Sequence, residues 1–130
     1  MNGRKIKKGF AKKYPEATII FLPHDHPREI LCEIEPATEH PDYSVAISVI
    51  EKSAPHYHKV AAEEYEVLSG EVTLYFGDEK RVLKAGDKAI IKPGTVHWAR
   101  SNSGWIKCTS RPGWVPSDHL LYESKFEDEN

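Results

Sequence analysis

The amino-acid sequence predicts a single all-β domain, either a sandwich or a closed barrel. Its 130 residues can bury one hydrophobic core but leave no room for a second domain of ordinary size. Short runs of alternating apolar and polar residues recur along the chain, and turn residues separate them. No segment has the pattern of a helix of convincing length. Many short strands without intervening helices are typical of these two architectures.

The candidate strands follow one another in regular order. Three early runs each end at a proline-containing segment, and they span residues 17–22, 29–35 and 42–51. Between Gly70 and Gly86, two further alternating runs are separated by a glycine–aspartate turn, which is typical of a β-hairpin. The last candidate strands span residues 104–110 and 119–122.

The charge distribution argues against a nucleic-acid partner and against a secretory signal. The formal net charge is −2 at pH 7. Basic residues concentrate in residues 1–16, but no apolar segment follows them, so we expect a solvated arm rather than a signal peptide. Residues 124–130 form an acidic tail that we expect to fray. No stretch is long and apolar enough to cross a bilayer, so we expect no membrane partner.

The two cysteines, Cys32 and Cys108, indicate a reducing compartment. They lie far apart in strand-like runs, and no secretory signal accompanies them, so we expect free thiols rather than a disulfide. Small buried side chains are the plain interpretation of both. The sequence therefore predicts a cytoplasmic protein.

Three histidines and one glutamate form the most informative pattern in the chain. Alternate residues of a strand share a face, so His56 and His58 can present their rings to one point. Glu63 follows His58 at an odd interval, so residues 59–62 must form a turn that lets the next strand aim Glu63 back at this point. His97 comes from a distant strand, after a Pro-Gly turn. If the four side chains converge, they can hold a divalent metal ion.

Each of these residues has an ordinary interpretation when it is taken alone. A histidine at a strand end is more often a surface or hydrogen-bonded residue than a metal ligand, and short motifs are weak evidence. His24 and His26 form a second alternating pair, but the prolines around them indicate a loop, where we expect surface residues. His40 and His119 have no partner that the sequence reveals.

The joint pattern resembles the two signature motifs of the cupin superfamily. In the first motif, H-x-H-(x4)-E-(x6)-G, the matching residues are His56, His58, Glu63 and Gly70. In the second motif, they are Gly86, Asp87, Pro93, Gly94 and His97. Two positions depart from the family pattern: Lys92 stands where cupins often have proline, and Ser101 where they usually have asparagine. Neither departure removes a ligand.

The resemblance implies a single small cupin β-barrel of the double-stranded β-helix, or jelly-roll, type. We expect this barrel to span residues 17–123. The resemblance also implies that one divalent transition metal ion, which can be iron, manganese, nickel, cobalt or zinc, is bound by His56, His58, Glu63 and His97. Small cupins commonly pair through strands at the barrel edge, so a homodimer is the expected assembly.

Three functions fit such a site. The first is an enzyme that acts on a small carboxylate, carbonyl or sugar-like substrate, either as an oxygenase, and thus an oxidoreductase, or as an isomerase or lyase. The second is a non-catalytic module that binds or senses a small molecule. The third is a structural cupin that acts through dimerisation, which would leave four polar ligands crowded together without an ion. We favour the enzyme, although the sequence identifies no catalytic acid or base outside the ligand set.

Three residues are candidates for substrate binding. Tyr65 shares the strand alternation of Glu63, so its hydroxyl can meet a ligand in the cavity, while a buried core tyrosine is the plain alternative. Arg111 and Trp114 lie in a turn-rich segment that can close over the barrel mouth. We expect this segment to bind an anionic or ring-bearing substrate, or to have a purely structural role.

Overall fold

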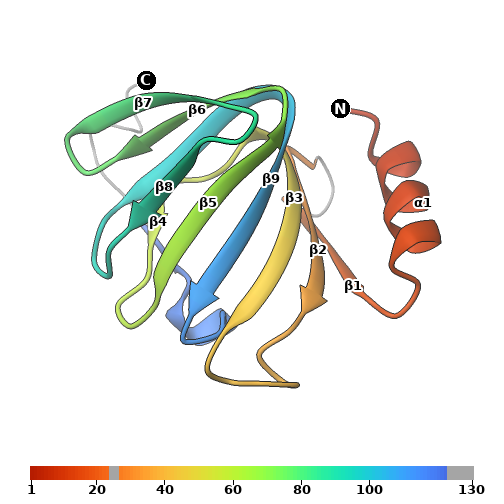
Figure 1. Cartoon of the computed structure of the whole chain (residues 1–130), viewed down its shortest axis with the longest axis horizontal. Coiled ribbons are helices and arrows are strands. Elements are labelled where there is room, and N and C mark those ends of the chain that lie inside the picture. The colour runs from red at the N-terminus through yellow and green to blue at the C-terminus, as the bar shows by residue number, and fades with distance from the viewer. Residues whose placement is uncertain (24–26, 123–130) are drawn as a thin grey trace.

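The computed structural model describes residues 1–23 and 27–122. Within these ranges the chain forms ten β-strands, one α-helix and one 3-10 helix (Figure 1). The predicted surface histidines His24 and His26 and the acidic tail 124–130 lie outside the described residues. The elements are α1 (Gly3–Lys13), β1 (Thr18–Leu22), β2 (Glu29–Glu35), β3 (Ser44–Lys52), β4 (His56–Tyr57), β5 (Ala62–Ser69), β6 (Glu71–Phe76), β7 (Glu79–Lys84), β8 (Lys88–Ile91), β9 (His97–Arg111), η1 (Pro116–Asp118) and β10 (Leu120–Leu121).

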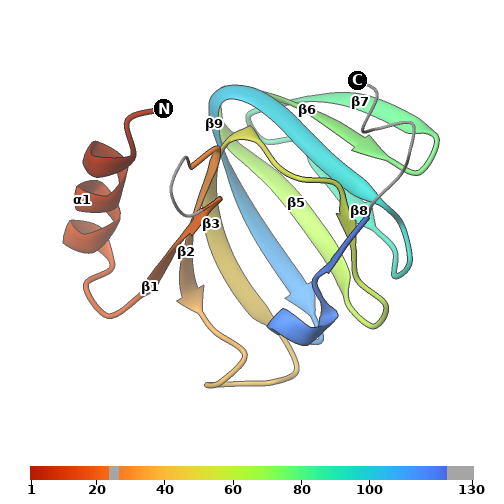
Figure 2. The ribbon, with the colours of Figure 1, turned by 180° about the vertical axis from the view of Figure 1, so that it is seen from behind.

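All of these strands belong to one antiparallel sheet that curls into a half-open barrel (Figures 1 and 2). The longest strand, β9, is central to it, because β3, β4, β5 and β6 all pair with β9. The hairpin predicted between Gly70 and Gly86 is confirmed as β6 and β7, and Gly77 in its turn has a φ of 57°. The all-β prediction is therefore confirmed.

A bend near Gly104 lets β9 serve both halves of the barrel. Before the bend, β9 pairs mainly with β6 and also with His56 and Lys52; after it, β9 pairs with β3 and β5. A Cβ at position 104 would lie 2.8 Å from Cγ2 of Val72, so only glycine fits there. The Ser101 hydroxyl donates to the carbonyl of Ile50 and accepts the N–H of Gly104. Serine, which replaces the asparagine of the family pattern, thus stabilises this bend.

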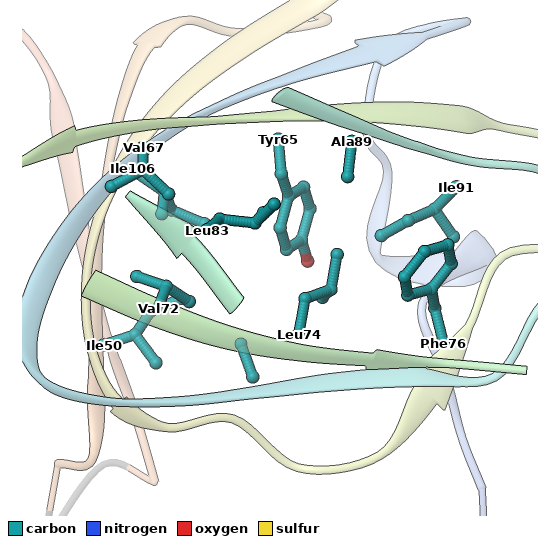
Figure 3. Close-up of a cluster of buried hydrophobic side chains, with 11 residues drawn as sticks. Ile50, Tyr65, Val67, Val72, Leu74, Phe76, Leu83, Ala89, Ile91 and Ile106 are labelled. Atoms are coloured by element: carbon teal, nitrogen blue, oxygen red, sulfur yellow. The ribbon is translucent and has the colours of Figure 1, made fainter. Parts of the chain in front are cut away.

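One hydrophobic core fills the inside of the curled sheet (Figure 3). Its members come from β3, β5, β6, β7, β8 and β9, and alternate residues of these strands point inward. Each fully buried aliphatic side chain contributes about 1.5–3 kcal/mol to stability. The largest of these are Ile50, Leu74, Ile91 and Ile106. The packing of this core keeps the strands that carry the predicted ligands in fixed positions.

A second core lies on the outer face of β2 and β3, where α1 packs. Phe10 is 1% exposed, and its ring centroid lies 5.1 Å from that of Trp105. The side chain of Asn2 caps the helix by accepting the N–H of Lys5. The expectation of a solvated arm without a helix is wrong for this segment. This segment has one apolar pair at helical spacing, Ile6 and Phe10, and the basic residues around the pair obscure the helical pattern in the sequence.

Both cysteines are free thiols, as the sequence predicts. Cys32 is fully buried in the core under α1, and Cys108 is half-buried on the inner face of β9. Within the described ranges, no helix is both long and apolar enough to span a membrane. Three expectations from the sequence stay predictions: the domain limits at residues 17 and 123, the cytoplasmic location and the homodimer.

Candidate metal centre

The four candidate ligands meet at one point inside the curled sheet. β4 begins at His56, with His58 two residues later, while β5 carries Glu63 and β9 begins at His97. His56 and His97 face each other directly in the ladder between β4 and β9. One ligand atom from each of the four residues lies within 4.8 Å of all the others. Each residue is at most 5% exposed. The structure thus brings together every residue of the proposed ligand set.

Main-chain carbonyl groups orient all three imidazole rings. Each Nδ1 atom lies 2.8–2.9 Å from a carbonyl oxygen, and the pairs are His56 with Ala54, His58 with Asp118 and His97 with Thr95. A carbonyl oxygen can only accept, so each Nδ1 must carry the proton. In the neutral ring, each Nε2 is then an unprotonated nitrogen with a lone pair. This arrangement is typical of metal-binding histidines.

The carboxylate of Glu63 lies against two of these nitrogens. Its Oε1 atom is 3.1 Å from Nε2 of His58 and 3.0 Å from Nε2 of His97. Lone pairs at this separation repel a carboxylate unless a proton or a cation lies between them. Two ligands bound to one ion at about 2.1 Å stand roughly 3 Å apart when they are neighbours. The spacing therefore suits a shared cation.

The electrostatics of the centre favour positive charge at this point. Burial alone would raise the pKa of Glu63, but the His58 and His97 rings beside its carboxylate hold that pKa well below its usual range. Burial alone would lower the pKa of His58, but the Glu63 carboxylate beside its ring raises it. Burial lowers the pKa of His56 to about 3, and the charges of His97 and His119 add to this. His56 is thus a neutral ligand.

One buried atom shows directly that the residues fit a metal ion. Nε2 of His58 is fully enclosed yet has no hydrogen bond of acceptable geometry in the described part of the chain. A buried polar nitrogen without a partner is costly. Coordination of a divalent ion would satisfy this atom and the facing carboxylate together. The donor set of three imidazoles and one carboxylate accepts several first-row transition metals.

The thiol of Cys108 holds the second oxygen of the candidate carboxylate ligand. Its Sγ atom donates to Oε2 of Glu63 at 3.3 Å, which leaves Oε1 directed at the histidines. Burial raises the pKa of Cys108 well above its usual range, and the charge of Glu63 adds to this. The thiol therefore stays protonated and acts as a donor that positions Glu63.

The C-terminal segment also supports the centre, a feature that the sequence did not reveal. The main-chain oxygen of Asp118 accepts from His58, and its carboxylate accepts the N–H groups of Lys59, Val60 and Ala61 at 2.8–3.3 Å. Burial alone would raise the pKa of Asp118, but these amides lower it. Asp118 thus fixes both the ring of His58 and the turn that leads to β5.

The next residue, His119, lies against the candidate ligands. Its ring stacks on that of His56 with a centroid distance of 4.3 Å and an angle of 15°. The indole N–H of Trp114 donates to Nδ1 of His119 at 3.2 Å. His119 therefore keeps its proton on Nε2 when it is neutral. Burial and the charge of His58 lower the pKa of His119, so the neutral form is favoured.

A cavity of about 190 Å³ opens beside the centre, and both His56 and Glu63 line it. Of the predicted substrate-binding residues, Tyr65 and Trp114 line this cavity. The ring of Tyr65 also belongs to the inner core (Figure 3). This residue therefore lies at the border between the core and the cavity. Arg111 is not part of the lining: its guanidinium lies over the ring of Tyr43 at 5.2 Å. The binding roles of all three stay predictions.

Strand β2 contributes an acidic wall to the cavity, which consists of Glu29, Glu33 and Glu35. Burial raises the pKa of the Glu29 carboxyl to about 7, and the charge of Glu63 adds to this. Burial also raises the pKa of Glu33. Glu35 accepts from His40 and from the hydroxyl of Tyr43, at 3.3 Å each. In the sequence, the alternation of residues 29–35 is typical of an ordinary strand with one face toward solvent, so the sequence alone does not predict the acidic wall.

Comparisons with known proteins agree with this architecture. A family model described as a cupin domain matches residues 44–105. An uncharacterised protein of Aquifex aeolicus (strain VF5) is 39% identical over 72 residues, which make up 55% of this chain and 60% of that protein. The chain therefore matches less than two thirds of that relative's length.

Solved structures with the same fold cover most of the chain. Pac13 of Streptomyces, described as a nucleoside dehydratase, has a TM-score of 0.70 and 19% identity over 88% of this chain and 92% of its own. An uncharacterised Klebsiella pneumoniae protein with a double-stranded β-helix domain has a TM-score of 0.64 and 28% identity over 77% of this chain and 89% of its own. The family model, this shared fold and the two motifs agree with one another: the chain has the cupin fold, and its residues 44–105 match a cupin domain.

Proposed function

We propose that this protein is a divalent-metal-dependent enzyme that transfers protons on a small polar substrate, as an isomerase or a lyase. The observation that carries the proposal is the convergence of three oriented imidazoles and one carboxylate beside a cavity. A substrate in this cavity would lie next to His56 and Glu63. The position of the cavity supports chemistry at the metal centre rather than at a remote site.

The ligands in this proposal are His56, His58, Glu63 and His97. When bound, a divalent ion supplies a Lewis acid that polarises a carbonyl or hydroxyl oxygen of the substrate. The three carbonyl contacts keep the histidine rings in place, and Cys108 keeps Glu63 in place. Such outer contacts maintain the geometry of a metal site and the basicity of its ligands.

Other residues of the cavity can move or hold protons. The Glu29 carboxyl has a pKa of about 7 because it is buried, so it can give or take a proton near neutral pH. Burial raises the pKa of Tyr65 well above its usual range, so its hydroxyl remains a hydrogen-bond donor. A carboxyl group that changes protonation near neutral pH suits proton transfer, and this favours isomerase or lyase chemistry over oxygenation. The dehydratase activity named for Pac13 is compatible with this reading, although that likeness concerns the fold alone.

The experiment that tests this function follows hydrogen exchange in deuterium oxide by NMR. The full-length protein is loaded separately with Mn²⁺, Fe²⁺, Co²⁺, Ni²⁺ and Zn²⁺ and incubated with small hydroxyaldehydes and hydroxyketones. We expect at least one metal to promote deuterium incorporation next to the carbonyl, and we expect chelation or the double substitution His58→Ala with His97→Ala to abolish it. Tight binding of a panel compound without any exchange would favour a binding module and contradict the proposal.

A further inference from the structure

We propose that the acidic wall of Glu29, Glu33 and Glu35 makes the cavity selective for uncharged hydroxylated substrates and excludes carboxylates. The inference rests on the proposed function, because it concerns the same metal centre. Of the substrate classes that the sequence leaves open, it favours the carbonyl and sugar-like compounds over the small carboxylates.

The wall and the metal centre belong to one cavity. The three wall residues line it from β2, and His56 and Glu63 line it from β4 and β5. In the ladder between β2 and β3, Glu29 pairs with Ile50 and Glu33 pairs with Ala46, so the wall adjoins the inner face of β3. A substrate in this cavity can therefore contact both the wall carboxyl groups and the metal centre.

The residues that line the cavity include acidic side chains without matching lysines or arginines. Among the described residues that line the cavity, four are glutamates and none is lysine or arginine. The nearby cation of Arg111 is directed onto the ring of Tyr43 instead. Three neutral histidines and one carboxylate leave a single positive charge on a divalent ion, and that charge alone would attract anions. Above about pH 7, where Glu29 is ionised as well, the three wall carboxylates outnumber that positive charge, so the cavity as a whole repels anions.

The wall residue Glu29 lines the same cavity as Tyr65 and Cys108. The charge of Glu29 contributes to raising the pKa of Tyr65 and of Cys108, after burial and the charge of Glu63. Glu29 is therefore within electrostatic reach of the side chains that surround the metal centre. In a buried site of low dielectric constant, one such charge changes the affinity for an anion by about tenfold or more.

The remaining lining residues suit a hydroxylated molecule. Carboxylates accept hydrogen bonds from substrate hydroxyl groups, and the hydroxyls of Ser48 and Tyr65 offer further polar contacts. The ring of Trp114 provides an apolar face for carbon-bound hydrogens. A neutral polyol or hydroxyaldehyde satisfies both kinds of surface, whereas a carboxylate leaves like charges facing each other.

The test compares the affinities of anionic and neutral probes for the Mn²⁺-loaded full-length protein by calorimetry. The probes are oxalate, D-xylonate and D-xylose. D-Xylonate carries a carboxylate at the position where D-xylose has its aldehyde. The variant is the double substitution Glu29→Gln with Glu33→Gln, and the single substitution Glu33→Gln serves if the double variant does not fold. The control is Glu64→Gln with Glu66→Gln, which removes the same charge from β5 positions that do not line the cavity.

At pH 8, where Glu29 is ionised in the wild type, we expect oxalate and D-xylonate to bind the wall variant about a hundredfold more tightly than the wild type, or about tenfold for the single substitution. D-Xylose should show no such gain, and the control should behave like the wild type. Equal oxalate affinities in wild type and wall variant, or an equal gain in the control, would overturn the inference alone. Failure of the wild type to bind any of the five divalent ions named above would instead overturn the proposed function on which it rests.

Discussion

The ring of His58 is held by a residue sixty positions further along the chain. Its Nδ1–H donates to the main-chain oxygen of Asp118 at 2.8 Å. The carboxylate of the same aspartate accepts the amides of the turn that separates His58 from Glu63. One residue of the C-terminal segment therefore fixes the relative positions of two candidate ligands.

The substitution Asp118→Ala should weaken metal binding without removing a ligand. Loss of the carboxylate releases the turn and lets the carbonyl that orients His58 move. We expect the Kd for Mn²⁺ or Zn²⁺ to rise by about tenfold to a hundredfold in titration calorimetry. The matched control is Asp87→Ala, because Asp87 also accepts a main-chain amide, that of Lys84, in the exposed turn between β7 and β8. Equal losses in both variants would show that Asp118 has only a general structural effect.

The carboxyl of Glu29 should make the metal-free protein less stable as the pH rises. Burial raises its pKa to about 7 in the folded state, whereas the ordinary value is 4.5. The folded state therefore binds the proton more tightly, and its stability falls between these two pH values. The wild type should lose on the order of 3 kcal/mol relative to Glu29→Gln between pH 4.5 and pH 8.

Urea unfolding of both chelator-treated proteins across this pH range measures that difference directly. Other titrating groups of the centre are common to the two proteins, so they largely cancel. A difference between the two proteins that does not change with pH would show that Glu29 is solvated and has an ordinary pKa.

The substitution Phe10→Ala should detach α1 from the barrel. Phe10 is the one residue of α1 that is buried, and its side chain packs on Trp105 and the outer face of β2. Truncation of a buried phenylalanine typically costs about 3–5 kcal/mol. Chemical denaturation should show this loss, while Lys12→Ala, at an exposed position of the same helix, should change stability by less than about 0.5 kcal/mol. A small effect of Phe10→Ala would mean that the helix contributes little to the fold.

Much of the fold follows from local sequence patterns. The strands and the β6–β7 hairpin could be predicted because alternation and glycine turns are visible within a few residues. The ligand set could be predicted for the same reason, since His56, His58 and Glu63 lie within one short motif. The helix α1 could not, because its stability depends on long-range contacts of Phe10 and Ile6 with the sheet.

The supporting residues of the site depend on tertiary contacts that no local pattern reveals. Asp118 and His119 meet the centre only because the chain returns to β4 after β9 and pairs there as β10. The alternation of β2 gives two faces, one apolar and one acidic, and the acidic face normally indicates solvent. Here it lines a cavity, because the sheet curls around that side. Sequence reasoning thus identified the cluster of candidate ligands and missed the residues that orient them.

The metal content of the purified protein tests directly whether this cluster is a metal centre. The protein should be purified without an affinity tag after metal-replete growth, and its metal content measured by mass spectrometry beside the double variant His58→Ala with His97→Ala. We expect close to one divalent transition metal ion per chain in the wild type and little in the variant. A folded wild-type protein with almost no metal, or with the same content as the variant, would contradict a metal centre at these four residues.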